Sequence, residues 1–266
     1  MSTRLFGARL FTSVFALCVI SGAGKAQLSA AGSARLDSLR RSPELAGTLI
    51  YEGAVFALHG PGADTLFRYQ RRVRTTTTGI SVTHATRDPA GALIIDESAQ
   101  LSAAYDFQRF DAANAQAGIS GSVVSSQGGR HLEYTLNDKG RVSTSSEDVQ
   151  DPVVAGPSVH GFIRQHWNEL ATGGKIRVRM IVLNRKTSYG FDLRMKSQAG
   201  GQTTFSSTPS SALVRLVIKP LYVVFANSDR SLVRYEGRVP PMQAVGGKLK
   251  DLDARVEYRM VAAVLR

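Results

Sequence analysis

Residues 175–208 read KIRVRMIVLNRKTSYGFDLRMKSQAGGQTTFSST, and this stretch decides the fold class. In its first part the apolar residues Ile176, Val178 and Met180 alternate with arginines. Such alternation is typical of a half-buried β-strand, because successive side chains of a strand point to opposite faces. The alternation returns over 189–196 and 202–208, and Gly200-Gly201 between them suits a tight turn. The stretch therefore predicts antiparallel strands joined by short turns.

The same pattern covers most of the chain from Thr48 onward. Runs rich in branched and aromatic residues are separated by turn sequences, such as Asp88-Pro89-Ala90-Gly91 and Asn137-Asp138-Lys139-Gly140. We predict a mainly β fold, a curved antiparallel sheet of about 10–12 strands that forms a half-barrel or open barrel. Pro240-Pro241 predicts a loop near the end of the chain. The further strands are expected at 48–57, 66–75, 80–86, 92–100, 105–111, 119–125, 131–137, 221–225, 232–237 and 253–264.

Residues 157–170 follow a helical period instead. Pro157 suits the first turn of a helix, and Gly173-Gly174 provides a stop. This segment predicts one amphipathic helix packed on the sheet, and 211–218 predicts a second, short helix. The apolar stripe of the first helix consists of Val159, Phe162, Ile163, His166, Trp167 and Leu170.

The N-terminal segment has the pattern of a secretory signal. Arg4 and Arg9 precede an uncharged, mostly apolar run over 10–20, and small residues stand before a cleavage point after Ala26. That run is shorter than the roughly 20 residues that span a bilayer. Cys18, the only cysteine, lies inside the segment, with lipidation there as an alternative to apolar filler. We expect a signal peptide at 1–26, a flexible linker at 27–46, a single β-rich domain at 47–266, and a periplasmic or secreted protein.

The chain is strongly basic, with 33 Lys and Arg against 21 Asp and Glu and a formal net charge of +12. Such a charge attracts anionic partners, which in an envelope are lipid headgroups, lipopolysaccharide or acidic glycans. The arginines are scattered and accompany no recognition helix or zinc finger, so no nucleic acid partner is expected. A simply solvated basic surface stays open as the alternative.

Catalytic and metal-binding motifs are missing from the sequence. There is no nucleophile elbow, no phosphate-binding loop and no zinc helix. His160 and His166 are six residues apart, which places them on different helix faces, and Asp96 and Glu97 point to opposite sides of a strand. Asp251 and Asp253 give only a weak calcium pattern. We expect no catalytic set, no metal and no cofactor, and the oligomeric state stays open.

Aromatic residues are concentrated in the second half of the chain, where they fit either an ordinary core or a partly open apolar cavity between sheet and helix. As candidate lining of such a cavity we take Phe162, His166, Trp167, Tyr189, Phe191, Tyr222, Phe225 and Tyr235.

The stretch 156–237 resembles a family of uncharacterised bacterial periplasmic domains. The resemblance rests on Gly161-Phe162-Ile163 with Trp167, Gly174-Lys175, Tyr189-Gly190-Phe191, Pro220-Leu221-Tyr222 and Arg234-Tyr235-Glu236-Gly237. The architecture of this family is similar to the half-barrel of the outer-membrane lipoprotein carriers. The resemblance implies a curved sheet with a helix on its concave side, and it implies no particular ligand.

Three functions remain open at this point. The first is a non-enzymatic periplasmic binding or carrier protein for a lipid or other amphipathic ligand, with an anionic membrane surface as a further partner. The second is an envelope structural or interaction protein that acts through exposed strand edges and a basic surface. The third is an envelope hydrolase whose catalytic residues are dispersed in sequence.

Overall fold

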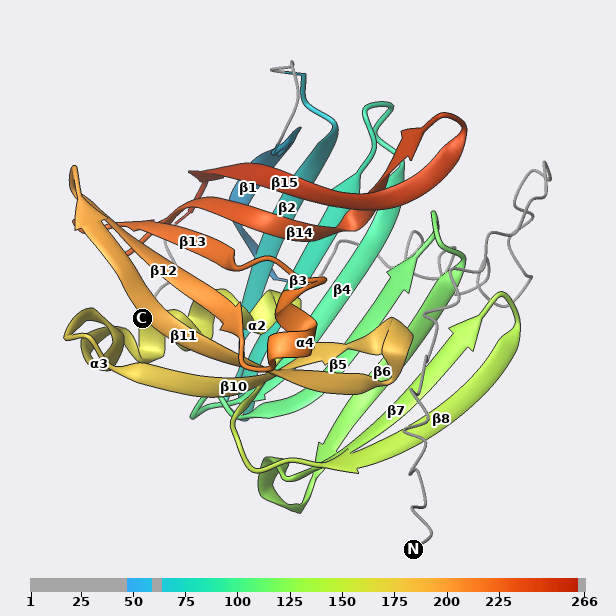
Figure 1. The fold of residues 1–266 in the computed structure, drawn as a ribbon, viewed down its shortest axis with the longest axis horizontal. Helices are drawn as coiled ribbons and strands as arrows, with labels where there is room; N and C mark the ends of the chain where they lie inside the picture. Colours follow the sequence, from blue (N-terminus) through green and yellow to red (C-terminus); the bar gives the residue numbers. More distant parts are fainter. Residues whose placement is uncertain (1–46, 59–63, 263–266) are drawn as a thin grey trace, which may run out of the picture.

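The structure, a computed structural model, describes residues 47–58 and 64–262 and confirms a mainly β fold with a helix packed on the sheet (Figure 1). The expected signal peptide 1–26 and linker 27–46 lie outside the described residues. All strands of these described residues belong to one open, curved sheet of 15 strands. They are β1 (Thr48–Ala57), β2 (Phe67–Thr75), β3 (Gly79–Arg87), β4 (Leu93–Ser102), β5 (Phe107–Asn114), β6 (Ile119–Ser126), β7 (His131–Asp138), β8 (Arg141–Asp148), β9 (Val153–Val154), β10 (Lys175–Val182), β11 (Thr187–Ala199), β12 (Gln202–Pro209), β13 (Leu221–Ala226), β14 (Leu232–Val245) and β15 (Lys248–Met260).

The strands follow one another across the sheet almost entirely in chain order. The order runs from β8 at one edge through β1 to β15 and on to β9 at the other edge. All neighbouring pairs are antiparallel except β9 and β10, which are parallel. Strands β1 and β15 pair at the centre, with Val55 opposite Val256. The first and last described strands therefore join the two halves of the sheet into one continuous surface.

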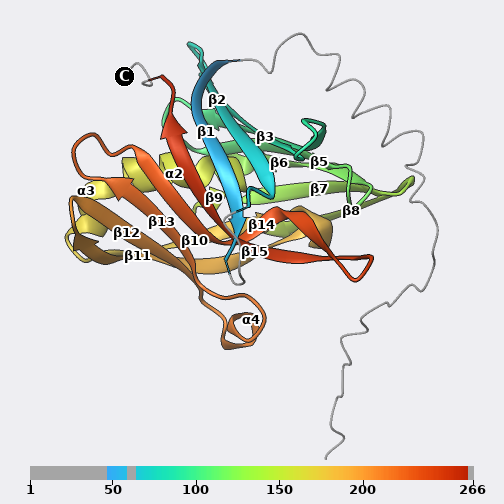
Figure 2. The ribbon, with the colours of Figure 1, turned by 90° about the horizontal axis from the view of Figure 1, so that it is seen from above.

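Two helical segments fill the concave side of this sheet, α2 (Gly156–Gln165) and α3 (Trp167–Ala171). Figure 2 shows them enclosed between the β1–β8 half and the β10–β15 half. The expected continuous helix is interrupted at His166, whose backbone angles of φ −94 and ψ 19 leave the helical region. The interruption lets the chain follow the curvature, since α2 lies against β3 and β4 while α3 lies against β10 and β11. The second expected helix is a single turn, α4 (Ala212–Arg215).

Among the described residues the sheet has 15 strands, more than the expected 10–12, and two of the strands that the sequence does not predict lie at the edges, without apolar alternation. Strand β8 reads RVSTSSED and is exposed along most of its length, so it has no buried face for the sequence to show. Strand β9 has only two residues. Pro240-Pro241 lies inside β14 rather than in a loop, at an irregularity in the pairing between Val239 and Met242. Proline is tolerated there because a bulge does not need its missing N–H group.

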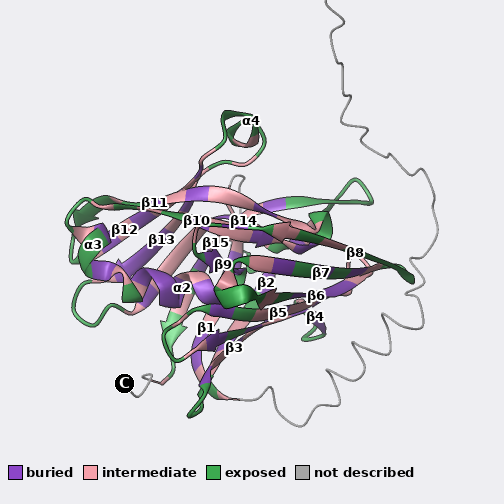
Figure 3. Ribbon diagram, turned by 90° about the horizontal axis from the view of Figure 1, so that it is seen from below, coloured by how far each residue is buried: buried purple, intermediate pink, exposed green. Residues whose placement is uncertain are grey.

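The largest core lies under the helices and is rich in aromatic rings. Trp167 packs edge-on against Phe205 and Phe225, with ring centroids 5.0 and 5.5 Å apart. Ile163 and Leu170, both fully buried, belong to the same cluster. Figure 3 shows the buried positions on α2 and on the strands that face it. The concave side is thus largely filled by side chains, and burial of this apolar surface holds the helices in place.

A half-buried carboxylate connects the edge strand β8 to the opposite half of the sheet. Glu147 Oε1 accepts hydrogen bonds from the Tyr134 hydroxyl and from the Ser188 backbone N–H, both at 2.6 Å. Arg179 forms an ion pair with its other oxygen at 3.3 Å. The two halves of the sheet therefore meet at this place through side chains, without a strand ladder.

Candidate ligand-binding site

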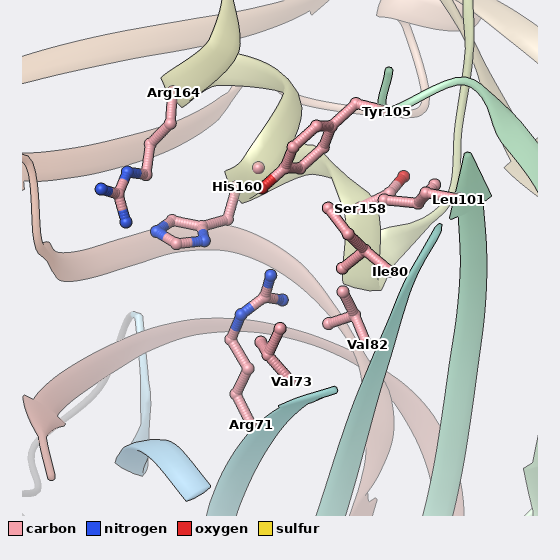
Figure 4. A pocket seen from close by; sticks show the side chains of 10 residues that line it. Arg71, Val73, Ile80, Val82, Leu101, Tyr105, Ser158, His160 and Arg164 are labelled. Carbon is pink, nitrogen blue, oxygen red and sulfur yellow. The ribbon is translucent and has the colours of Figure 1, made fainter. Parts of the chain in front are cut away.

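A cavity of about 50 Å³ lies between α2 and strands β2–β4 (Figure 4). One part of its lining is aliphatic and comes from the sheet, and the other part is polar and comes mainly from the helix. The aliphatic residues are Val73, Ile80, Val82 and Leu101, and the others are Arg71, Tyr105, Ser158, His160, Gly161 and Arg164. The cavity therefore offers apolar and cationic surface side by side.

Arg71 is the central polar residue of the cavity. It stands on β2 between Tyr69 and Val73 on the inward face, and its side chain is only 3% exposed. Its Nη1 donates hydrogen bonds to His84 Nε2 and to the backbone oxygen of Pro157, both at 2.7 Å. Its Nε has no hydrogen-bond partner among the described residues. Within residues 47–58 and 64–262, no carboxylate lies within ion-pair distance of the Arg71 guanidinium.

Burial lowers the pKa of Arg71 from its ordinary value, but a guanidinium keeps its proton in proteins. A buried cation that lacks an anionic partner costs free energy, because it has left water without a compensating charge. The arrangement around Arg71 thus leaves a positive charge and one N–H donor unused inside the protein.

Two neutral histidines accompany this guanidinium. Arginine has no acceptor, so His84 Nε2 accepts from Arg71 and the imidazole proton must sit on Nδ1. His160 on α2 is 8% exposed, and neither of its ring nitrogens has a hydrogen-bond partner within residues 47–58 and 64–262. Burial, reinforced by the charge of Arg71, holds the pKa of both imidazoles well below 6.5. His160 therefore keeps one free N–H donor and one free acceptor.

Aromatic rings fix the position of His160. Its ring stacks on Phe225 at a centroid distance of 5.4 Å and an interplanar angle of 11°. Tyr51 meets the same ring edge-on at 5.6 Å. The hydroxyl of Tyr51 is itself held, because it accepts the backbone N–H of Leu232 at 3.1 Å. These contacts fix the plane in which the free His160 nitrogens lie.

Behind Arg71 and His84 lies a second layer of half-buried ionisable groups. Glu97 on β4 stands directly opposite His84 on β3. Burial, with a smaller contribution from Asp96, raises the pKa of the Glu97 carboxyl to about 7. Tyr69 packs edge-on against His84 at 4.8 Å and against Tyr258 at 5.4 Å, and burial raises the pKa of both phenols above 10. Glu97, Tyr69 and Tyr258 are therefore mostly uncharged below neutral pH, so these three groups do not neutralise Arg71.

Tyr105 covers the cavity from the connection between β4 and β5. Its φ of 68° lies in the left-handed region, which is unusual for a bulky residue and costs about 1–2 kcal/mol. Its ring packs on Gly161 of α2 so closely that a Cβ at Gly161 would lie 2.8 Å from Tyr105 Cε1. Figure 4 shows the Tyr105 hydroxyl and the guanidinium of half-buried Arg164 near His160 and Arg71. Donors from three separate segments thus converge on one small space.

None of the eight residues taken from the sequence as candidate lining borders this cavity. The structure brings six of them together in or against the core under the helices. His166 lies 4.4 Å from the Phe162 ring and 3.7 Å from a Glu169 oxygen, and Tyr222 lies under Lys196 at 3.9 Å. The six core residues are Phe162, Trp167, Phe191 and Phe225, which are buried, and Tyr189 and Tyr235, which pack against them.

The sequence analysis did not identify the polar residues of the cavity, although the sequence contains one signal for Arg71. Arg71 occupies an inward position of an alternating strand, and a charge at such a position is unusual. His160 lies outside the expected apolar stripe of the helix and is buried, whereas His166 was assigned to the stripe and is half-exposed. Helix α2 ends before His166, so the His166 side chain does not continue the stripe of α2.

The described residues contain no group of three or more His, Cys, Asp or Glu side chains that could hold a metal ion. Asp251 and Asp253, the weak calcium pattern, both contact Arg238, and the Asp253 oxygen lies 2.8 Å from Arg238 Nε. Within residues 47–58 and 64–262, no helix combines the length and apolar character needed to cross a membrane.

Comparison with known proteins adds no assignment. Neither a scan against protein-family models nor a search of the curated proteins finds a match for this chain. The resemblance to periplasmic carrier-like domains therefore stays a prediction, and the function has to be argued from the chemistry of the site.

Proposed function

We propose that this protein is a non-enzymatic binding or carrier protein for an amphipathic ligand, exported to the periplasm or beyond. The observation that carries the proposal is the lining of the cavity under α2, where four aliphatic side chains of the sheet face a buried, uncompensated guanidinium. Ligand pockets commonly combine apolar walls with a few polar groups that orient the ligand. A polar head joined to an apolar chain matches this combination.

The size of the cavity determines how such a ligand would bind. About 50 Å³ holds a few water-sized groups, enough for a headgroup but not for a chain. An acyl chain needs room that α2 and α3 now occupy. Besides its apolar packing, α2 forms two hydrogen bonds with the sheet and its connections. Arg71 donates to the Pro157 backbone oxygen, and the Gln165 side chain donates to the Ala104 backbone oxygen at 2.9 Å. In our proposal the chain of the ligand displaces part of the helical segment from the concave face, while His160 of α2 stays at the cavity.

The only tryptophan of the chain reports on this movement. Trp167 begins α3, is buried, and packs against Phe205 and Phe225. Ligand binding is expected to shift its fluorescence and to add a stoichiometric lipid mass in native mass spectrometry. Ile80→Phe places a ring in the cavity and should abolish both signals. Val142→Phe, at an exposed position of β8, is the matched control. Unchanged fluorescence and an unaltered apo mass after incubation with membrane lipids would rule out the carrier function.

The turn around α4 supports the further proposal that the protein docks on an anionic membrane surface. Leu213, Leu216 and Val217 are 77%, 83% and 67% exposed, and Figure 2 shows α4 projecting away from the body of the sheet. No Asp or Glu occurs between Asp192 and Asp229. Apolar side chains next to uncompensated positive charge fit an anionic bilayer surface. The basic residues of this segment are Arg194, Lys196, Arg215 and Lys219.

Vesicle flotation tests this docking. The protein should float with vesicles that contain phosphatidylglycerol and less with vesicles of phosphatidylcholine alone. Leu216→Asp should reduce flotation, whereas Val142→Asp, at a position that is 67% exposed on another part of the sheet, should not. Equal flotation of both variants would exclude the α4 turn as the docking element. Self-association lost in Leu216→Asp would favour an interaction protein instead.

A hydrolase is the second candidate, because His84, His160 and Glu97 lie close together in the interior. The chemistry of these groups argues against it. Arg71 occupies the acceptor nitrogen of His84, and a depressed pKa makes either imidazole a weak general base. The nearby Ser158 hydroxyl is engaged in a reciprocal contact with the Ala155 backbone, at 2.9 and 3.0 Å. Ester or amide hydrolysis that is lost in His160→Gln would overturn the non-enzymatic proposal.

A further inference from the structure

The cavity under α2 contains hydrogen-bond donors and a positive charge for which the described residues provide no partner. Arg71 Nε and both nitrogens of His160 are buried and without partners among the described residues. Buried polar groups in native proteins are nearly always hydrogen-bonded, so a cluster of exceptions calls for a ligand. Both side chains are more than nine-tenths buried and both border the same cavity.

The geometry of the Arg71 guanidinium narrows the ligand to an anion with paired oxygens. Nη1 is already used by His84 and Pro157, which leaves the edge that carries Nε. A guanidinium edge matches a carboxylate or phosphate, whose two oxygens accept parallel N–H bonds. Neutral His160 adds one N–H donor, and the Tyr105 hydroxyl lies over the same space.

Size and charge then favour a carboxylate over a phosphate. The cavity is about 50 Å³, and among the described residues Arg71 is the one fully buried cation that borders it, while Arg164 is half-buried at its side. A carboxylate is planar, has three heavy atoms and carries one negative charge, which one buried guanidinium neutralises. A phosphate monoester is larger and carries close to two charges at neutral pH.

We propose that this cavity binds the single carboxylate of an amphipathic acid, with Arg71 Nε and the His160 N–H as donors to its oxygens and Arg164 as a second positive charge. This inference rests on the proposed function, since it names the headgroup class of the same ligand. The aliphatic residues Val73, Ile80, Val82 and Leu101 adjoin the carboxylate site and mark where the apolar chain begins.

The first test changes the ligand and leaves the protein intact. Dodecanoate, dodecanol and dodecyl phosphate are titrated against the full chain at pH 6.5, where Glu97 is mostly protonated, with calorimetry and Trp167 fluorescence as readouts. Hydrogen bonds to a charged group are worth about 1.5–3 kcal/mol, so dodecanoate should bind on the order of 10- to 100-fold more tightly than dodecanol. Equal affinities of acid and alcohol would overturn the carboxylate site and leave the carrier proposal standing. Tighter binding of dodecyl phosphate would also overturn the assignment to a carboxylate.

The second test changes the protein. Arg71→Met should remove the preference for the acid and leave dodecanol binding within about threefold of wild type. Arg74→Met is the matched control, because it removes a positive charge from the exposed side of the same strand. If Arg71→Met does not fold, Arg164→Gln at the side of the cavity replaces it and should weaken dodecanoate selectively. An unchanged preference for the acid in whichever of these two variants folds would contradict the site.

A short acid separates this inference from the carrier proposal. Butyrate has the carboxylate but hardly any chain. If butyrate raises the thermal midpoint of wild type and not that of Arg71→Met, the carboxylate site stands even where no long-chain ligand binds. If long-chain alcohol binds and butyrate has no effect at saturating concentration, the carrier proposal stands and the carboxylate site falls.

Discussion

Replacing Glu97 with glutamine should change how the stability of the protein depends on pH. Burial and the neighbouring Asp96 raise the pKa of the Glu97 carboxyl from 4.5 to about 7. A carboxyl whose pKa is raised by folding binds more protons in the folded state than in the unfolded state between these two values. Its contribution to stability is therefore complete below pH 4.5 and is lost as pH rises through 7. Glutamine has no such proton, so Glu97→Gln should remove this loss.

The size of the effect follows from the two pKa values. Each pH unit between 4.5 and 7 is worth about 1.4 kcal/mol, which gives about 3 kcal/mol in total and about 2.5 kcal/mol between pH 5 and pH 8. The opposite trend comes from His84 and His160, whose lowered pKa values make stability fall as pH drops below 6.5. The histidine contribution is the same in the variant and in wild type. The difference between their unfolding free energies therefore cancels it and is the quantity to measure.

Urea denaturation at pH 5, 6, 7 and 8 provides the assay. The unfolding free energy of Glu97→Gln minus that of wild type should rise by about 2.5 kcal/mol from pH 5 to pH 8. Glu133→Gln, at an exposed carboxylate on β7, is the control for removal of a negative charge elsewhere in the sheet. A difference that stays constant across this range would show that Glu97 does not titrate near 7, and the account of the second layer would be wrong.

Three further substitutions test the packing that positions the site. Gly161→Ala should destabilise wild type despite the higher helix propensity of alanine, because its Cβ would lie 2.8 Å from the Tyr105 ring. In a Tyr105→Ala background the same substitution should stabilise the protein by about 1 kcal/mol. Thermal midpoints of wild type, both single variants and the double variant test this, and additive effects of the two substitutions would show that the contact is unimportant. Leu170→Ala, at a fully buried position of α3, should cost about 2–5 kcal/mol in urea denaturation, and a cost below 1 kcal/mol would mean that α3 is not packed on the sheet. Glu147→Gln should cost about 1–3 kcal/mol and raise hydrogen exchange at the Ser188 amide, whereas unchanged exchange there would contradict the bridge between β8 and β11.

The sequence predicts the fold class well because strand patterning is local. Alternation of Ile176, Val178 and Met180 with arginines requires one buried face, and the structure pairs this segment with β11 as expected. The same logic fails for β8, because an edge strand with both faces polar has no alternation to detect. It also fails at His166, where the curvature of the sheet, a property of all 15 strands together, interrupts a helix that its local sequence would continue.

The candidate site is harder to predict because it depends on contacts between distant segments. Arg71 and Pro157 are 86 residues apart in the chain, and the local sequence around either residue does not predict the hydrogen bond between them. Aromatic residues drew attention to the second half of the chain, where most of them form core. The unpaired donors lie instead where α2 meets β2–β4. A charged residue on the inward face of a strand was the only local signal, and it marks a position but not its partners.

A crystal structure of the full chain with dodecanoate tests the central claim most directly. Our account predicts a carboxylate oxygen within hydrogen-bond distance of Arg71 Nε, a second contact from the His160 ring, and helical residues beyond His160 displaced along the acyl chain. A structure with dodecanoate bound elsewhere, or with Arg71 Nε still without a partner and α2 in its present position, would contradict it.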